Sequence, residues 1–164
     1  MTMAKAITSG YFPLGATLIG EAVAEAFEAD TTTFGSIGHG YTYSGHPVAC
    51  AAGLAALELL VEEQLPERVA REAPFWEALL HDALADKAHV ADVRNFGFAG
   101  ALTLDPYPGE PLRRPFEVAM MMWEKGFLVR YGGDTIQLAP HFVMEQEQMT
   151  SLVSALGESL TELA

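Results

Sequence analysis

The sequence has 164 residues, with 9 basic and 22 acidic side chains and a formal net charge of −13 at pH 7. Half of the residues are hydrophobic, which is enough to bury a core and argues against wholesale disorder. The acidic balance argues against nucleic acid and anionic membrane surfaces as partners, because both attract clustered Lys and Arg. Cys50 is the only cysteine, so no intrachain disulfide is expected. With no disulfide framework, a reducing cytoplasm is the expected compartment. No apolar stretch is long enough to span a bilayer.

The first third of the chain predicts a short strand, a helix, a long loop and a second helix. The strand is expected at 16–20 and the first helix at 21–28, and residues 29–46 form a loop rich in glycine and threonine. Pro47 suits the first turn of a helix that continues to about residue 63. The small apolar residues of that helix predict one closely packed face. That face comprises Val48, Ala51, Ala52, Ala55 and Leu59.

Three further helices are expected in the second part of the chain. The first covers 66–85, and Pro74 inside it should kink it or split it in two. The next covers 116–125 and ends at Gly126. The last begins near Glu145 and has a regular apolar stripe, which predicts a buried face. That face comprises Met149, Leu152, Val153, Leu156 and Leu160.

Short strands separate these helices. They are expected at 99–104, 127–130 and 135–138, so this part of the chain is predicted to be α+β. We therefore expect two domains. Residues 1–64 form a glycine-rich part that carries the candidate site residues, and residues 65–164 form a small α+β domain.

Lys5 has small or apolar neighbours on both sides. Such surroundings are expected to desolvate the amine and to favour its neutral form. A neutral amine is what Schiff-base chemistry with an aldehyde cofactor requires. The alternative is an ordinary surface lysine.

The segment 38–47 is rich in glycine, hydroxyl and aromatic residues and leads into a helix. Backbone N–H groups, hydroxyls and the helix dipole together suit a phosphate group. The segment lacks the lysine and the spacing of a nucleotide-binding P-loop, so ATP is not expected. A turn-rich connector before a capped helix is the alternative. His39 and His46 have no cysteine or carboxylate cluster nearby, so no metal site is expected.

Arg130 follows an apolar stretch and precedes Gly132, Gly133 and Asp134. An arginine in this position can bind a carboxylate with two parallel hydrogen bonds. The alternative is a salt bridge at the end of the strand, with Asp134 as its partner.

Taken together, four segments resemble the class III aminotransferases, which depend on pyridoxal phosphate, and most closely their ω-amino acid:pyruvate branch. The Schiff-base lysine segment of that family resembles residues 3–16, and its phosphate-contacting segment resembles residues 39–52. The start of its small domain resembles residues 93–98, and its late arginine segment resembles residues 128–140. The resemblance implies an α/β fold, the C-terminal part of a fold-type I transferase. Residues 1–64 would be the end of the large cofactor-binding domain, and residues 65–164 the small α+β domain.

The resemblance also implies roles for Lys5, Tyr41, Thr42 and Arg130. Lys5 would form the Schiff base with pyridoxal 5′-phosphate and move a proton between the substrate Cα and the cofactor. Thr42 would bind the cofactor phosphate beside the Tyr41 backbone, across the interface of an isologous homodimer. Arg130 would bind the carboxylate of the substrate or of pyruvate. The implied reaction moves an amino group from an amine or ω-amino acid to pyruvate.

Two departures from the family pattern leave alternatives open. His141 stands where the family often has a second proline, so the local turn is open to change. The family's Gly-Ser phosphate loop, stacking aromatic and pyridinium aspartate have no counterpart here and are expected upstream of Lys5. The chain is therefore also interpreted as a non-catalytic fragment, or as one half that is complemented by an N-terminal half in trans. An aminomutase or decarboxylase of the same class would share Lys5 and Thr42.

Overall fold

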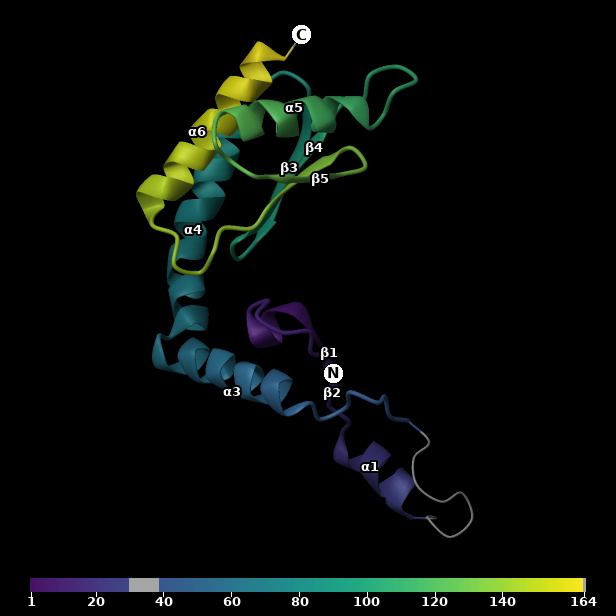
Figure 1. The fold of residues 1–164 in the computed structure, drawn as a ribbon. Helices are drawn as coiled ribbons and strands as arrows, with labels where there is room; N and C mark the ends of the chain where they lie inside the picture. The colour runs from purple at the N-terminus through teal and green to yellow at the C-terminus, as the bar shows by residue number, and fades with distance from the viewer. Residues whose placement is uncertain (30–38, 164) are drawn as a thin grey trace. The chain divides into compact units, whose positions relative to one another are not determined.

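The computed structural model describes residues 1–29 and 39–163. The chain is divided into two compact units, Met1–Gln64 and Leu65–Ala164, and each is described by itself. Figure 1 shows the elements of both units along the chain. No helix in the described residues combines the length and the apolarity that crossing a membrane requires.

The described residues of the first unit form a two-stranded antiparallel sheet, a 3-10 turn and two helices. Strands β1 (Thr2–Met3) and β2 (Ala16–Thr17) pair with each other, and the turn η1 (Lys5–Thr8) lies between them in sequence. The strand predicted at 16–20 is therefore shorter than expected, because Gly20 is already the extended N-cap of α1 (Glu21–Glu28). Most of the loop predicted at 29–46 lies outside the described residues.

Helix α3 (Pro47–Glu62) begins at Pro47 as predicted, but the prediction of its packed face is wrong. Val48 is 56% exposed and Leu59 is 51% exposed, whereas the buried residues are Ala49 and Gly53. The packed face is thus displaced by one position along the helix. Gly53 packs against Leu14 and the 3-10 turn, since an added Cβ would lie 3.1 Å from Leu14 Cδ2 and 3.6 Å from the Ile7 carbonyl oxygen.

The second unit contains a four-stranded antiparallel sheet in the order β3-β4-β6-β5. Strands β4 (Ala99–Leu104) and β6 (Thr135–Leu138) occupy the centre and match their predicted ranges. Strand β3 (Val90–Phe96) lies at one edge and was not predicted. Strand β5 (Arg130–Gly132) lies at the other edge.

The strand predicted at 127–130 is wrong because this segment caps helix α5 (Arg113–Glu124). Gly126 has a φ of 87°, and its N–H donates to the Trp123 carbonyl. The Phe127 N–H then donates to the Met122 carbonyl at 2.8 Å, which is the pattern of a Schellman cap. Phe127 and Val129 pack on the core beside the helix end, whereas Leu128 is 83% exposed, and the strand starts only at Arg130.

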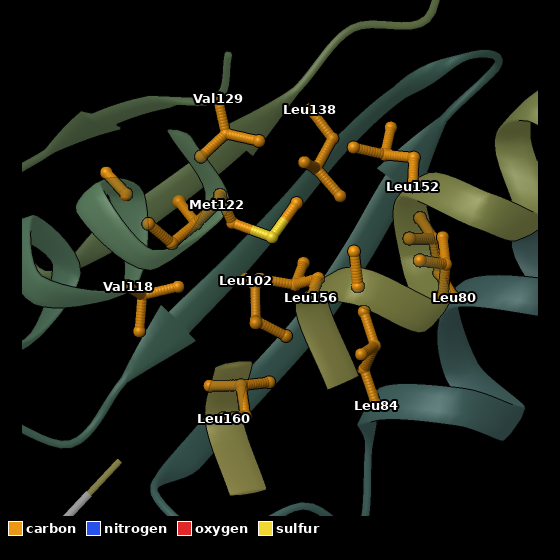
Figure 2. Close-up of a cluster of buried hydrophobic side chains, with 14 of the residues drawn as sticks. Leu80, Leu84, Leu102, Val118, Met122, Val129, Leu138, Leu152, Leu156 and Leu160 are labelled. Atoms are coloured by element: carbon orange, nitrogen blue, oxygen red, sulfur yellow. The ribbon is translucent and has the colours of Figure 1, made fainter. Parts of the chain in front are cut away.

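Helices α4 (Leu65–Leu84) and α6 (Gln146–Glu162) complete the second unit. Pro74 lies inside α4 without splitting it, contrary to one of the two expected outcomes. Arg68 of α4 donates to the Met144 carbonyl at 2.9 Å and fixes the start of α6. The predicted buried face of α6 is confirmed. Side chains from all three helices and the sheet form the core in Figure 2.

Alternation along the strands separates a core-facing side of this sheet from an outward-facing side. Leu102 and Ile136 are paired across β4 and β6 and are fully buried. The next positions along the strands face outward. They form one cross-strand row, which runs through Arg94, Ala101, Gln137 and Arg130.

Candidate functional site

Lys5 begins the 3-10 turn in a conformation that L-residues rarely adopt, with a φ of 55°. Thr8 stabilises the turn, since it is buried and its Oγ1 donates to the Phe12 carbonyl at 2.6 Å. The prediction that neighbouring residues desolvate Lys5 is wrong, because its side chain is exposed in this structure. A left-handed backbone at a long side chain costs roughly 1–2 kcal/mol and is typical of functional positions.

The turn that carries Lys5 rests on the first half of α3. An added Cβ on Gly53 would lie 3.6 Å from the Ile7 carbonyl oxygen and 3.9 Å from Thr8 Cγ2. Both are ordinary contact distances for a Cβ, and the tighter approach at Gly53 is to Leu14 Cδ2, at 3.1 Å. Helix α3 thus packs closely on the lysine segment at a glycine, which costs a helix about 1 kcal/mol relative to alanine. Helix α3 therefore positions the backbone of the lysine segment.

The segment before α3 forms a closed turn. The Tyr41 N–H donates to Ser44 Oγ at 2.9 Å, and the Ser44 N–H donates to the Tyr41 carbonyl at 2.9 Å. Thr42 lies within this turn and is exposed. The turn leads into the N-terminus of α3, where free N–H groups and the helix dipole favour an anion. The Tyr41 N–H is already used by Ser44, so it is not free for a ligand in this structure.

An aromatic stack connects the lysine segment with the Thr42 turn. The rings of Phe12 and His46 lie 4.9 Å apart with an interplanar angle of 29°. This contact was not predicted from the sequence: Phe12 was named for no role, and His46 was considered only as a metal ligand. Nδ1 of His46 is buried and has no hydrogen-bond partner among the described residues.

A cavity of about 640 Å³ opens beside this stack. Its walls come from both segments, but neither Lys5 nor Thr42 lines it. The lining residues are Phe12, Pro13, Leu14, Gly15, Tyr41, Tyr43, Ser44, Gly45, His46 and Ala49. The first unit thus carries an exposed amine at Lys5, an exposed hydroxyl at Thr42 in the turn that precedes α3, and a partly apolar cavity. This donor set fits an aldehyde cofactor that carries a phosphate group.

Arg130 belongs to the second unit, where it is exposed at the first position of the edge strand β5. The expected alternative of a salt bridge with Asp134 is wrong for this structure. Asp134 Oδ1 accepts a hydrogen bond from Thr135 Oγ1 at 2.8 Å instead. Among the ion pairs of the described residues, none involves Arg130. Its guanidinium therefore remains available for a carboxylate ligand.

The turn after β6 forms despite the departure at His141. The Met144 N–H donates to the His141 carbonyl at 2.9 Å, and Glu145 and Gln148 form a reciprocal capping box at the start of α6. The imidazole of His141 is exposed. A second proline at that position is thus not required for this turn.

The profile of the aminotransferase class-III family matches residues 1–160, so the chain belongs to this family. A beta-alanine–pyruvate aminotransferase of Pseudomonas aeruginosa is 43% identical over all of this chain and 37% of the relative. An omega-amino acid–pyruvate aminotransferase of Pseudomonas putida is 45% identical over 99% of this chain and 36% of the relative. The chain thus spans about a third of the length of these relatives.

Solved structures agree with this family membership. An amine transaminase from an uncultivated Pseudomonas species, in its PLP-bound form, is 35% identical and superposes with a TM-score of 0.91. The match covers 99% of this chain and 38% of the amine transaminase chain. A PMP-bound aminotransferase from Vibrio fluvialis is 30% identical with a TM-score of 0.88, over 99% of this chain and 38% of that one. The fold is therefore that of part of a fold-type I transaminase, a class whose cofactor is pyridoxal phosphate.

Proposed function

We propose that this chain carries the lysine and arginine parts of an aminotransferase site. The reaction moves an amino group from an amine or ω-amino acid to pyruvate, which gives a carbonyl compound and alanine. The observation that carries the proposal is Lys5, exposed and held with a φ of 55° on a turn that α3 supports. The pyruvate acceptor is supported by the names of the two Pseudomonas relatives, both of which are pyruvate aminotransferases.

Each candidate site residue has a distinct role in this proposal. Pyridoxal phosphate, when bound, supplies the electron sink that the protein itself lacks. Lys5 holds the cofactor through Nζ and, once released, moves a proton at the substrate Cα. The Thr42 hydroxyl and the α3 N-terminus would bind the phosphate of the cofactor that a second copy of the chain holds, with the Tyr41 backbone beside them. Arg130 binds the carboxylate of the substrate or of pyruvate.

We further propose that this activity needs a second polypeptide surface. The described residues of the first unit bury only Thr8, Ala49 and Gly53. Large apolar side chains are exposed there, including Leu54 at 62% and Val61 at 73%. Exposed apolar area of this extent is typical of an interface. An N-terminal half in trans or a second copy in an isologous homodimer would cover it. The protein would work in the cytoplasm.

Two readings of the same site compete with this proposal. An aminomutase or a decarboxylase of the same class would also use Lys5 and Thr42. A non-catalytic fragment would keep the fold without binding cofactor. The exposed apolar surface of the first unit favours a complementing half over an independent enzyme.

Trapping with borohydride tests the lysine assignment. The chain is incubated with pyridoxal phosphate, reduced, digested and mapped by mass spectrometry. We expect the label on Lys5 above the level on Lys87 and Lys125, the other two lysines of the chain. Lys5→Arg should remove the excess label while the other two sites remain unchanged. Equal labelling of all three lysines would contradict cofactor binding by this chain alone.

Complementation tests the reaction. Adding the upstream half of the P. putida relative in trans should give amine-dependent formation of alanine from pyruvate. Lys5→Ala should abolish that activity, whereas Lys87→Ala should not. Activity that survives Lys5→Ala would refute the lysine assignment.

A further inference from the structure

The outward face of the sheet places a second polar side chain directly beside Arg130. Arg130 of β5 pairs with Gln137 of β6, and both residues are exposed. Directly paired residues on adjacent antiparallel strands have Cβ atoms about 4.5–5.5 Å apart. The two side chains therefore reach the same volume of solvent above the hairpin.

The position of the Gln137 amide supports this arrangement. Its Nε2 lies 3.5 Å from the point where a Cβ on Gly132 would be. Gly132 lies two residues after Arg130 on the same strand and thus on the same face. The Gln137 carboxamide therefore lies over Gly132 and extends over the strand that carries the arginine.

The charged groups near Arg130 and Gln137 are engaged elsewhere, so this pair is available to a ligand. Arg94 stands at the far end of the same cross-strand row, but it is bonded to Asp92 and Thr103, both at 2.7 Å. Asp134 is held by Thr135, as described above. Among the described residues, no hydrogen bond uses the Gln137 side chain. Arg130 and Gln137 are thus a cation and a neutral donor with no competing carboxylate between them.

The chemistry of the pair fits a carboxylate. A carboxylate has about four acceptor positions, and a guanidinium fork occupies two of them. The Gln137 NH₂ group can donate to a third, and a neutral amide adds a donor without repelling the arginine. We propose that Gln137 is the second donor to the carboxylate that Arg130 binds. This pair then sets the preference for carboxylate-bearing substrates over simple amines. The inference rests on the proposed role of Arg130.

Titration of the isotope-labelled full chain with propanoate tests the inference, with propanamide as the uncharged probe. We expect propanoate to shift the NMR signals of both Arg130 Nε–H and the Gln137 side-chain NH₂, and propanamide to shift neither to the same extent. Gln137→Met keeps the length of the side chain and removes the donor. It should weaken propanoate binding about three- to tenfold, the loss expected for one charge-assisted hydrogen bond at an exposed site.

Further variants separate failure of this inference from failure of the proposed function. Gln137→Glu should abolish propanoate binding, because its carboxylate occupies Arg130. Arg94→Met, a change in the same cross-strand row, should leave the affinity unchanged. If Arg130→Met weakens binding but Gln137→Met changes it less than twofold, the role of Gln137 is refuted and that of Arg130 stands. If neither variant changes the propanoate response, or no response occurs, the role of Arg130 is refuted as well. Retained chemical-shift dispersion in each variant shows that the fold is intact.

Discussion

At the scale of single residues, Glu117 on α5 links two elements of the second unit. Its carboxylate accepts hydrogen bonds from Arg113 Nε at 2.7 Å and from the Tyr107 hydroxyl at 3.1 Å. The ring of Tyr107 also lies against the Arg114 guanidinium, 4.1 Å from centroid to Cζ. The hydrogen bond from Arg113 lowers the pKa of Glu117 below its ordinary value of 4.5. The arrangement ties the loop before α5 to the helix.

This lowered pKa predicts an acid-dependent loss of stability. As pH falls, the unfolded chain takes up the proton at Glu117 before the folded chain does. The stabilisation is therefore complete above the ordinary pKa and is lost as pH falls through the folded pKa. We expect Glu117→Gln to reduce the drop in free energy of unfolding between neutral pH and about pH 3, measured by urea denaturation. Glu77→Gln, an exposed change on α4, is the control. An equal drop in both variants would contradict the role of this carboxylate.

At the scale of elements, the end of α5 depends on one glycine. Gly126 has a φ of 87° and starts the Schellman cap that turns the chain toward β5. An L-residue in this conformation costs roughly 1–2 kcal/mol. The turn between β5 and β6 uses glycine in the same way, since Gly133 has a φ of 61°.

Gly126→Ala should accordingly lower the free energy of unfolding of the second unit by about 1–2 kcal/mol. Gly132→Ala is the matched control, because its backbone is outside the left-handed region and its nearest neighbour would lie 3.5 Å away. We expect that control to be neutral or slightly stabilising, since alanine restricts the unfolded chain. Equal destabilisation by the two changes, measured in the same urea titration, would contradict the argument.

Elements with a strong periodic pattern could be predicted from the sequence, and elements fixed by distant contacts could not. The apolar stripe of α6 depends only on helical spacing, so its buried face followed directly. Residues 127–129 are as apolar as a strand, but their first N–H belongs to a helix cap. The packed face of α3 was displaced by one position, because Gly53 rather than the larger apolar residues meets the 3-10 turn.

The same distinction applies to the candidate site. Lys5, Thr42 and Arg130 stand in contiguous motifs, so each could be singled out from its neighbours in sequence. Contact between Phe12 and His46 joins residues that are far apart in the chain. The exposure of Lys5 also depends on packing, which local composition does not determine.

At the scale of the whole molecule, the two units differ in how much they bury. The hydrophobic core described above lies entirely in the second unit and includes Trp76, Leu80, Met122 and Leu156, each 1% exposed or less. The first unit has no comparable cluster among its described residues. Burial of apolar area is the main favourable term in folding, so the second unit should account for most of the stability of the chain.

Residues 65–164 produced alone should therefore unfold cooperatively in urea, whereas residues 1–64 alone should show no cooperative transition. Circular dichroism and tryptophan fluorescence follow the first, since Trp76 and Trp123 both lie there. A cooperative transition of residues 1–64 at the same stability would contradict the difference in burial.

A core substitution gives the complementary test in the full chain. Leu156→Ala should destabilise the second unit by about 2–5 kcal/mol, because it removes a fully buried side chain. Leu54→Ala on α3 removes a side chain that is 62% exposed and should cost much less. Urea denaturation of both variants measures the difference. Similar costs would indicate that Leu54 is covered, for example in a homodimer.

The contact at Gly53 also fixes the exact number of residues that can separate Gly53 from the Thr42 segment at the start of α3. An α-helix turns 100° and rises 1.5 Å per residue. One residue inserted between Ala49 and Gly53 would rotate the glycine away from Ile7 and Thr8 and bring a side chain into the contact. The lysine turn would then lose its packing contact with α3, even though the residues of the lysine segment and of the Thr42 turn remained unchanged. The conformation of the lysine turn should therefore be far less sensitive to substitutions on the exposed side of α3 than to any change in the number of residues between Pro47 and Gly53.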